Sequence, residues 1–486
     1  MRPLPHILFI TTLLFTSVVE GRDPLVLPDL GESSTAALPQ QEAKKIGAAI
    51  YRQLQQEGLV VDDPVATPYI HAVGSRLLAT IPNRGQSDHP FHFFIVADDQ
   101  INAFALPGGY IGIHRGLIIA TQNVDELASV VAHEIAHITQ NHLPRRIDAA
   151  NRSQLPLTVA IIAAILTGQG AVTEAAIASA LATSQEQQLQ FSRAHEREAD
   201  SIGIETLHAS GYNPRGMAEF FQRLASHSRL YGRDDDSALD FLQTHPVTTD
   251  RIADAESRAQ QIAAVPALPP SDNRFLLVKT GLEIAASTTP LRVAERIALS
   301  GNDPIIASYA RAEALLKEEK FAPALIIAVQ LRERDPHELC YLLLHARLLH
   351  LQGERKEALE ILQEGTLLYP HYRLLGQLEL LWLLEDQQLE EARRKVHHLL
   401  RQFPQEPALF RHLARVETLS AHPAAANLAT GDAFLLEDRP ETARPYYLRA
   451  LDQAEGDFYL SSRIEAKIQL TDLTRKIKGG AITPEP

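Results

Sequence analysis

Residues of three types recur at a fixed spacing in the second half of the chain. The residues that recur every 34 positions are Leu315, Leu349 and Leu383; Ala324, Ala358 and Ala392; and Pro336, Pro370 and Pro404. A stacked helix-turn-helix of this period needs a small residue where its paired helices touch and a proline that ends each pair. Three registers that agree over three copies therefore predict an α-solenoid, in which each repeat packs only on its neighbours.

The period resembles that of the tetratricopeptide repeat, with a departure near the C-terminus. The next matching residues are Gly431 and Ala443, and Ala443 lies 51 residues after Ala392, which is one repeat and a half. We therefore expect an irregular helix around 410–427 to interrupt the stack. The proline-rich stretch 265–273 is typical of a linker. The expected segments are a signal peptide at 1–21, a first domain at 22–262, a linker at 263–273 and a tetratricopeptide-like repeat domain at 274–486.

The first residues predict export. The apolar run that follows Arg2 has about 13 residues, whereas a membrane span needs about 20. A cleavable signal is therefore favoured over a retained N-terminal anchor, which is the alternative. The chain has a single cysteine, Cys340, so it has no intramolecular disulfide. Avoidance of cysteine fits a bacterial periplasm, which is the expected location.

Composition excludes some functions. The chain of 486 residues carries 46 basic and 60 acidic side chains, and 46 − 60 gives a net charge of −14. An acidic balance of this size argues against a nucleic-acid partner, because such proteins track phosphates with basic side chains. One cysteine also excludes a multi-cysteine zinc site, so a metal would need histidine and carboxylate ligands.

The first domain is expected to combine helices with a small mixed sheet, which makes the whole chain mainly α. The expected helices are 41–57, 123–141 and 184–208, and the expected strands are 92–97, 103–106 and 110–114. Pro107, Gly108 and Gly109 predict a turn between the last two strands. Asn123 and Glu126 form a candidate capping box. The apolar segment 157–183 predicts a helical hairpin that covers the site or touches a membrane surface as a peripheral contact, or else packs in the core.

The helix at 123–141 contains the motif His133-Glu134-Ile-Ala-His137. Two imidazoles four residues apart lie on one helical face and can share a zinc ion, and Glu134 is placed to take a proton from water as general base. The third ligand is not set by spacing, since position 143 is a leucine and the next glutamates are Glu174, Glu186, Glu196, Glu198 and Glu205. Glu196 stands out because Asp200 follows it by four residues. The alternative is that 194–200 is a solvated, charged helix.

These motifs, with Asn102–Tyr110 and Ser192–Asp200, resemble the gluzincin metallopeptidases, the family that includes the CAAX prenyl peptidases and the HtpX heat-shock proteases. The resemblance implies a zincin-type metallopeptidase domain with one Zn²⁺ ion per chain. It places the family's E-x-x-x-D pattern at Glu196, so that Glu196 rather than Glu198 is the metal ligand. Asp200 then orients a liganding histidine.

The resemblance implies further site residues. The family binds substrate by strand addition to an edge strand, which maps here onto Asn102, Ala103, Phe104 and Ala105. In relatives with C-terminal repeats, a histidine equivalent to His245 can fill the open position of the zinc and keep the enzyme latent. The alternative is that His245-Pro246 merely opens a helix. Arg251 is a candidate to bind the substrate backbone or the developing oxyanion.

The implied function is that of a periplasmic zinc endopeptidase. Its expected clients are misfolded or stalled outer-membrane proteins, and its expected partner is their assembly machinery, bound through the repeat domain. The rival hypothesis is a chaperone or docking adaptor in which the peptidase fold is mainly a scaffold. The intact HExxH motif favours the enzyme, because a scaffold has no need of it.

Overall fold

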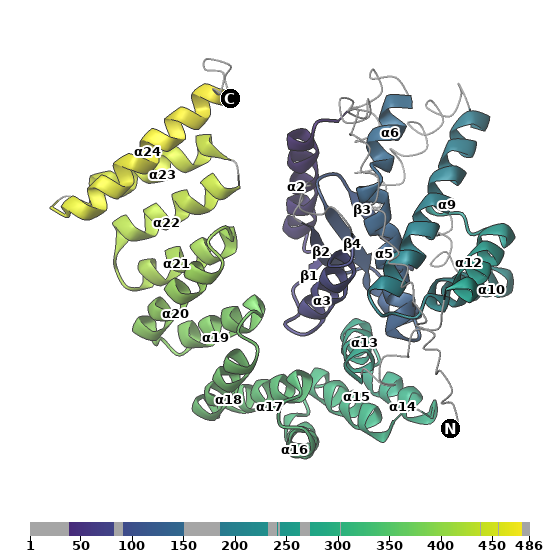
Figure 1. Cartoon of the computed structure of the whole chain (residues 1–486). Helices are drawn as coiled ribbons and strands as arrows, with labels where there is room; N and C mark the ends of the chain where they lie inside the picture. The colour runs from purple at the N-terminus through teal and green to yellow at the C-terminus, as the bar shows by residue number, and fades with distance from the viewer. Residues whose placement is uncertain are drawn as a thin grey trace, which may run out of the picture.

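The computed structural model describes residues 38–81, 91–149, 185–231, 241, 244–262, 273–301, 303–437, 439–454 and 456–478. The predicted signal peptide, the hairpin at 157–183 and the linker residues 263–272 lie outside the described residues. Figure 1 shows a first unit, which lies within residues 38–262 and holds a small sheet, followed by a curved row of helices. This arrangement confirms the expected mainly helical fold with a C-terminal helical repeat region, and the first unit, which carries the predicted metal ligands, is called the catalytic unit below.

The sheet has four strands in the described part of the chain. Its strands β1 (Val60–Val61), β2 (His92–Val96), β3 (Ala103–Leu106) and β4 (Tyr110–His114) lie in the order β1-β2-β4-β3. The predicted hairpin is confirmed, because β3 pairs with β4 in antiparallel register. β2 and β4 pair in parallel, so the sheet is mixed as predicted, although the sequence did not indicate which strands pair in this way. β3 is consequently an edge strand.

The turn between β3 and β4 rests on the helix α2 (Gln40–Gln56). Gly108 and Gly109 have φ values of +78° and +92°, in the left-handed region that favours glycine. Gly47 of α2 is buried under the turn, and a Cβ atom added there would stand 1.9 Å from the carbonyl oxygen of Pro107. The absence of a side chain at Gly47 therefore lets the turn approach the helix backbone.

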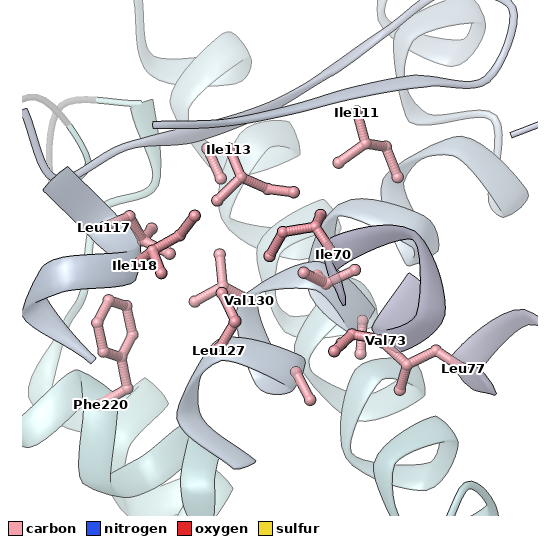
Figure 2. Packing of buried hydrophobic residues seen from close by; sticks show 14 of the residues in the cluster. Ile70, Val73, Leu77, Ile111, Ile113, Leu117, Ile118, Leu127, Val130 and Phe220 are labelled. Atoms are coloured by element: carbon pink, nitrogen blue, oxygen red, sulfur yellow. The ribbon is translucent and has the colours of Figure 1, made fainter. Parts of the chain in front are cut away.

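The core of the catalytic unit lies between the sheet and a layer of helices. These are α3 (Ala66–Leu78), α4 (Arg115–Ala120), α5 (Val124–Thr139), α6 (His142–Ala149), α9 (Gln185–Ala209), α10 (Arg215–Tyr231) and α12 (Thr249–Gln261). Figure 2 shows Ile111 and Ile113 of β4 above Ile70 of α3 and Val130 of α5. Burial of this apolar set, at about 25 cal/mol per Å² of surface removed from water, holds α5 against the sheet.

The start of α5 confirms half of the predicted capping box. The Asn123 side chain accepts a hydrogen bond from the backbone N–H of Glu126, 2.9 Å away. The return bond was wrong, because Glu126 accepts from the N–H of Gln122, at 2.8 Å, and not from Asn123. Glu126 is also paired with Arg223 of α10. The ion pair explains the difference, since Glu126 both closes the helix start and fastens α10 to α5.

The repeat region is a succession of antiparallel helices. They are α13 (Asn273–Ala286), α14 (Pro290–Leu299), α15 (Pro304–Lys317), α16 (Phe321–Arg334), α17 (Leu339–Gln352), α18 (Arg355–Leu368), α19 (Arg373–Glu385), α20 (Leu389–Gln402), α21 (Pro407–Leu419), α22 (Pro423–Leu436), α23 (Pro440–Gln453) and α24 (Phe458–Lys478). Ala324, Ala358 and Ala392 lie on α16, α18 and α20 and are fully buried where each helix meets its partner. The 34-residue period therefore corresponds to one pair of helices per repeat.

The irregularity predicted at 410–427 takes another form. α21 is a regular helix of 13 residues, and α22 begins at Pro423. α21 is an extra helix, packed on α20 and α22, between the pair that carries Ala392 and the pair that carries Gly431 and Ala443. One added helix accounts for the half repeat, so the prediction of an interruption was right and that of an irregular helix was wrong.

α13 belongs to two hydrophobic clusters at once. Phe275, Val278 and Leu282 pack in the core of the catalytic unit, whereas Leu277 and Ile284 pack in the first cluster of the repeats. The ammonium group of Lys279 also donates to the carbonyl oxygen of Thr121, at 2.6 Å. α13 therefore joins the two parts through its packing. Among the described residues, no helix combines the length and apolar character needed to cross a membrane.

Candidate metal centre

The helix α5 supplies the first two donors of the site. His133 and His137 lie one turn apart, and their Nε2 atoms are 3.0 Å from each other. Glu134 is buried beside them, and its Oε1 atom has no hydrogen-bond partner among the described residues. A buried carboxylate oxygen without a hydrogen-bond donor lowers the stability of a fold, and such atoms are often found at catalytic sites. The structure thus places Glu134 next to the cluster, and its role as the general base stays a prediction.

The helix α9 supplies the third donor. Gly203 marks the place where α9 packs on α5, since a Cβ atom added there would stand in ordinary contact with the backbone nitrogen of His133, at 3.4 Å. Glu196 Oε2 is 3.4 Å from His133 Nε2, and Glu196 Oε1 is 3.5 Å from His137 Nε2. The structure therefore brings Glu196 to the histidines. Glu198 lies instead against His142 and Arg145, outside this cluster.

His245 reaches the same cluster from the segment before α12. Its Nδ1 atom is 3.2 Å from His133 Nε2 and 3.1 Å from Glu196 Oε2. Its Nε2 atom faces Glu134 Oε1 at 3.4 Å. The ring thus touches two predicted metal ligands and the predicted base together. Its role as a fourth ligand stays a prediction.

The four donors fit a metal ion. A tetrahedral zinc with ligand bonds of 2.0–2.1 Å requires donors about 3.3 Å apart. The separations of His133 from the other three donors, and of Glu196 from His137 and His245, range from 3.0 to 3.5 Å. The four possible ligand atoms all lie within 4.8 Å of one another, and three of the four residues are buried. Histidine and carboxylate donors in this arrangement suit zinc.

Charge in the cluster favours the metal-binding forms of Glu196 and His137. Burial alone would raise the pKa of Glu196, but His245 and His133 outweigh it and hold that pKa well below its usual range. Burial lowers the pKa of His137, and the neighbouring His133 and His245 lower it further. An ionised glutamate and a neutral histidine are the forms that bind a metal.

Behind the donors, Asp200 and Arg251 hold His133. Asp200 Oδ1 is 3.0 Å from His133 Nδ1, and the guanidinium of Arg251 binds both oxygens of Asp200, at 2.7 and 2.8 Å. Arg251 also lies 3.1 Å from Glu196 Oε2 and donates to the carbonyl oxygen of Pro246. The predicted contact of Arg251 with substrate stays a prediction, since its guanidinium is occupied by these partners here.

The predicted substrate strand lies at the edge of the sheet next to α5. Ala103, Phe104 and Ala105 belong to β3, whose only strand partner in the described part of the chain is β4. Asn102 precedes β3, and its side-chain oxygen accepts from the N–H of Ala103, at 2.9 Å. β3 and α5 are in contact. A peptide added to the free edge of β3 would therefore run beside the cluster, as strand addition requires.

A second cluster of polar side chains lies beside the metal centre, and the sequence did not predict it. His142, His195 and Glu198 form a further cluster whose possible ligand atoms lie within 4.8 Å of one another. His142 contacts His137 directly, with 2.8 Å between their Nδ1 atoms. The signal available in the sequence was the third histidine five residues after His137. The ring contact itself depends on the turn between α5 and α6.

Two histidines and a glutamate on packed helices, with a second, buried glutamate beside the first histidine, define a metallopeptidase of the HExxH type. Residues 64–259 match the family model described as "Peptidase family M48". The beta-barrel assembly-enhancing protease of Yersinia pestis is 34% identical over 65% of this chain and 65% of its own length. A putative beta-barrel assembly-enhancing protease of Vibrio cholerae is 35% identical over 67% of each chain.

The corresponding Escherichia coli protease is 36% identical over 52% of this chain and 50% of its own length. The matches thus span between half and about two thirds of these curated relatives. The chain belongs to peptidase family M48. The predicted resemblance to the gluzincin metallopeptidases is confirmed by this family match and by the similarity to the beta-barrel assembly-enhancing proteases.

Proposed function

We propose that this chain is a zinc-dependent endopeptidase with one Zn²⁺ ion per chain. His133, His137 and Glu196 would hold the ion, which when bound supplies a Lewis acid for peptide hydrolysis. The Glu134 carboxylate takes the proton of the attacking water and passes it to the leaving amine. The observation that carries this proposal is the convergence of the three donors beside the unpaired Oε1 of Glu134.

The test replaces the proposed general base, Glu134, and leaves the three proposed metal ligands unchanged. Glu134→Gln is expected to abolish cleavage of an unfolded outer-membrane protein, while zinc content by mass spectrometry stays at one ion per chain. Glu205→Gln, an exposed position on α9, is the matched control and should cleave normally. A Glu134→Gln protein that still cleaves would exclude this mechanism. If it cleaves nothing yet supports outer-membrane assembly in cells, the chaperone hypothesis gains instead.

We further propose that His245 keeps the resting enzyme latent. With its Nδ1 among the donors and its Nε2 facing Glu134 at 3.4 Å, the ring occupies the space that water and substrate need. His245→Ala is expected to raise proteolysis several-fold, including self-cleavage. His422→Ala, in the repeat region, should leave activity unchanged. An unaltered or lower cleavage rate in His245→Ala would reject latency.

The proposed clients are misfolded or stalled outer-membrane proteins, and the proposed partner is their assembly machinery, bound by the repeat region in the periplasm. The names of the relatives support this assignment. The position of β3 at the edge of the sheet supports an extended, unfolded client, because only such a chain can add a strand. Cleavage of an unfolded β-barrel protein, with the folded barrel resistant, is the expected result. Equal cleavage of both forms would argue against it.

A further inference from the structure

We propose that His142 and Glu198 position the metal ligand His137, through a relay that runs from the surface to the metal. The inference rests on the proposed zinc site. His142 Nδ1 is 2.8 Å from His137 Nδ1, and His142 Nε2 is 3.3 Å from Glu198 Oε2. Arg145 Nη1 lies 3.0 Å from the same oxygen of Glu198. His142 itself is only 2% exposed, so the residues packed around its ring restrict the orientation of the ring.

The turn between α5 and α6 makes this contact. Asn141 has φ +53°, in the left-handed region, and it reverses the chain directly after α5. His142 then begins α6 with its ring folded back on His137. Arg145 lies one turn further along α6. Its position places it over Glu198 of α9, so that α5, α6 and α9 all contribute to the relay.

The hydrogen bonds allow a single arrangement of protons when metal is bound. His137 faces the cluster with Nε2, so the neutral ring carries its proton on Nδ1. Two ring nitrogens 2.8 Å apart share one proton, and therefore His142 Nδ1 accepts. His142 then carries its own proton on Nε2 and donates it to the Glu198 carboxylate. The relay fixes the tautomer and the ring plane of His137, as partners of metal ligands do.

The relay mirrors the one behind the other histidine ligand. Nδ1 of His133 meets Asp200, which Arg251 holds, whereas Nδ1 of His137 meets His142, which Glu198 and Arg145 hold. The two differ in exposure. The side chains of Asp200 and Arg251 are 9% and 4% exposed, whereas those of Glu198 and Arg145 are 35% and 32% exposed. The inserted His142 thus links a buried ligand to a carboxylate at the surface.

Ring stacking argues against a second metal ion in the cluster of His142, His195 and Glu198. The rings of His142 and His195 are stacked, with centroids 4.2 Å apart and planes at 11°. A ring nitrogen binds a metal in the plane of its own ring, and two stacked planes do not meet at one ion. His195 instead supports the face of His142 and keeps its edge directed at His137.

The test measures zinc affinity by competition with a chelator, which does not depend on activity. His142→Leu is expected to weaken zinc binding by about 10- to 100-fold. His142→Asn should restore most of the affinity, because its amide offers both an acceptor and a donor. Glu198→Gln should weaken binding by up to about tenfold. Glu205→Gln, exposed on the same helix, is the matched control without effect, and Glu196→Ala is the control that loses zinc.

The outcomes separate the relay from the metal site itself. If the wild-type chain binds no zinc, the proposed function fails. If wild type binds zinc and a folded His142→Leu binds it equally well, the relay alone is rejected. Two zinc ions in wild type that fall to one in His142→Leu would also overturn it. Should His142→Leu not fold, the surface variant Glu198→Gln decides, and an unchanged affinity there rejects the relay.

Discussion

Arg251 contacts two acidic side chains at the metal centre, Asp200 and Glu196. Its buried guanidinium binds Asp200 through two hydrogen bonds and lies 3.1 Å from Glu196. Both carboxylates are buried, and a buried charge without its partner costs several kcal/mol. Arg251 thus neutralises one ligand and orients the partner of another.

Arg251→Gln is expected to lower the free energy of unfolding of the metal-free protein by about 3 kcal/mol, because two buried carboxylates lose their counter-ion. Denaturant unfolding with the zinc removed measures this. Arg251→Lys should recover only part of the loss, since an ammonium group cannot bind both oxygens of Asp200. Arg258→Gln on the same helix is the exposed control. Equal stability of Arg251→Gln and wild type would show that the pairing contributes nothing.

For single residues, the sequence predicts the metal ligands better than it predicts the residues that hold those ligands in place. His133, Glu134 and His137 follow from helical spacing alone, and the structure brings Glu196 and His245 to them. His142 could not be predicted as a contact of His137, because the contact depends on the left-handed Asn141. Glu198 lies in the charged stretch 194–200, which in the sequence is also consistent with a solvent-exposed helix face. Its role becomes visible only when α6 lies over α9.

Among the elements, the packing of α2 on the β3–β4 turn governs the edge strand. Gly47 and the turn at 107–109 are in backbone contact, and β3 ends directly before that turn. A change in α2 is therefore transmitted to the strand proposed to bind substrate, although α2 contributes no residue to the metal cluster.

Gly47→Ala tests this link. The new methyl group would stand 1.9 Å from the Pro107 carbonyl oxygen, so the turn must move away from α2. The expected result is a loss of about 1–3 kcal/mol in unfolding free energy. The KM for a peptide substrate should rise more than kcat falls. Gly58→Ala, where the added Cβ atom meets nothing within 4 Å but φ is +72°, separates backbone strain from crowding. An unchanged KM would contradict the link.

The elements themselves were predictable where local chemistry decides them. The hairpin at 103–114 follows from its turn residues, and the repeat helices follow from their period. The parallel pairing of β2 with β4 is a different matter, because it joins strands through a connection with no local signal. The return bond of Glu126 was likewise mispredicted, since an arginine 97 residues away redirects the side chain.

For the whole molecule, the repeat region curves back to the catalytic unit (Figure 1). Arg52 of α2 donates to the carbonyl oxygen of Glu437 at the end of α22. The pKa of His71 in α3 is lowered by burial, then by His92, and also by Arg373 of α19 in the repeat region. The contacts are polar and charged, so they respond to pH and salt.

Acid is expected to weaken the protein through His71. Burial, with His92 and Arg373 nearby, lowers the pKa of His71 from 6.5 to about 4. The unfolded chain therefore binds the proton more tightly, and stability falls as pH drops from 6.5 to about 4, by at most about 1.4 kcal/mol per pKa unit. His71→Asn should flatten this part of the pH profile in thermal unfolding, whereas the exposed His337→Asn should not. Identical profiles for wild type and His71→Asn would refute this.

The helix α13 determines where this chain can be divided during evolution. Because Phe275, Val278 and Leu282 fill the catalytic core, a recombination event in the linker would leave that core with an open apolar face. Helices from α14 onward contribute no residue to that core, so we expect repeats there to be gained, lost or exchanged without that penalty. The heritable module is therefore the peptidase together with its first repeat helix, and diversity in binding partners is expected to accumulate from α14 onward.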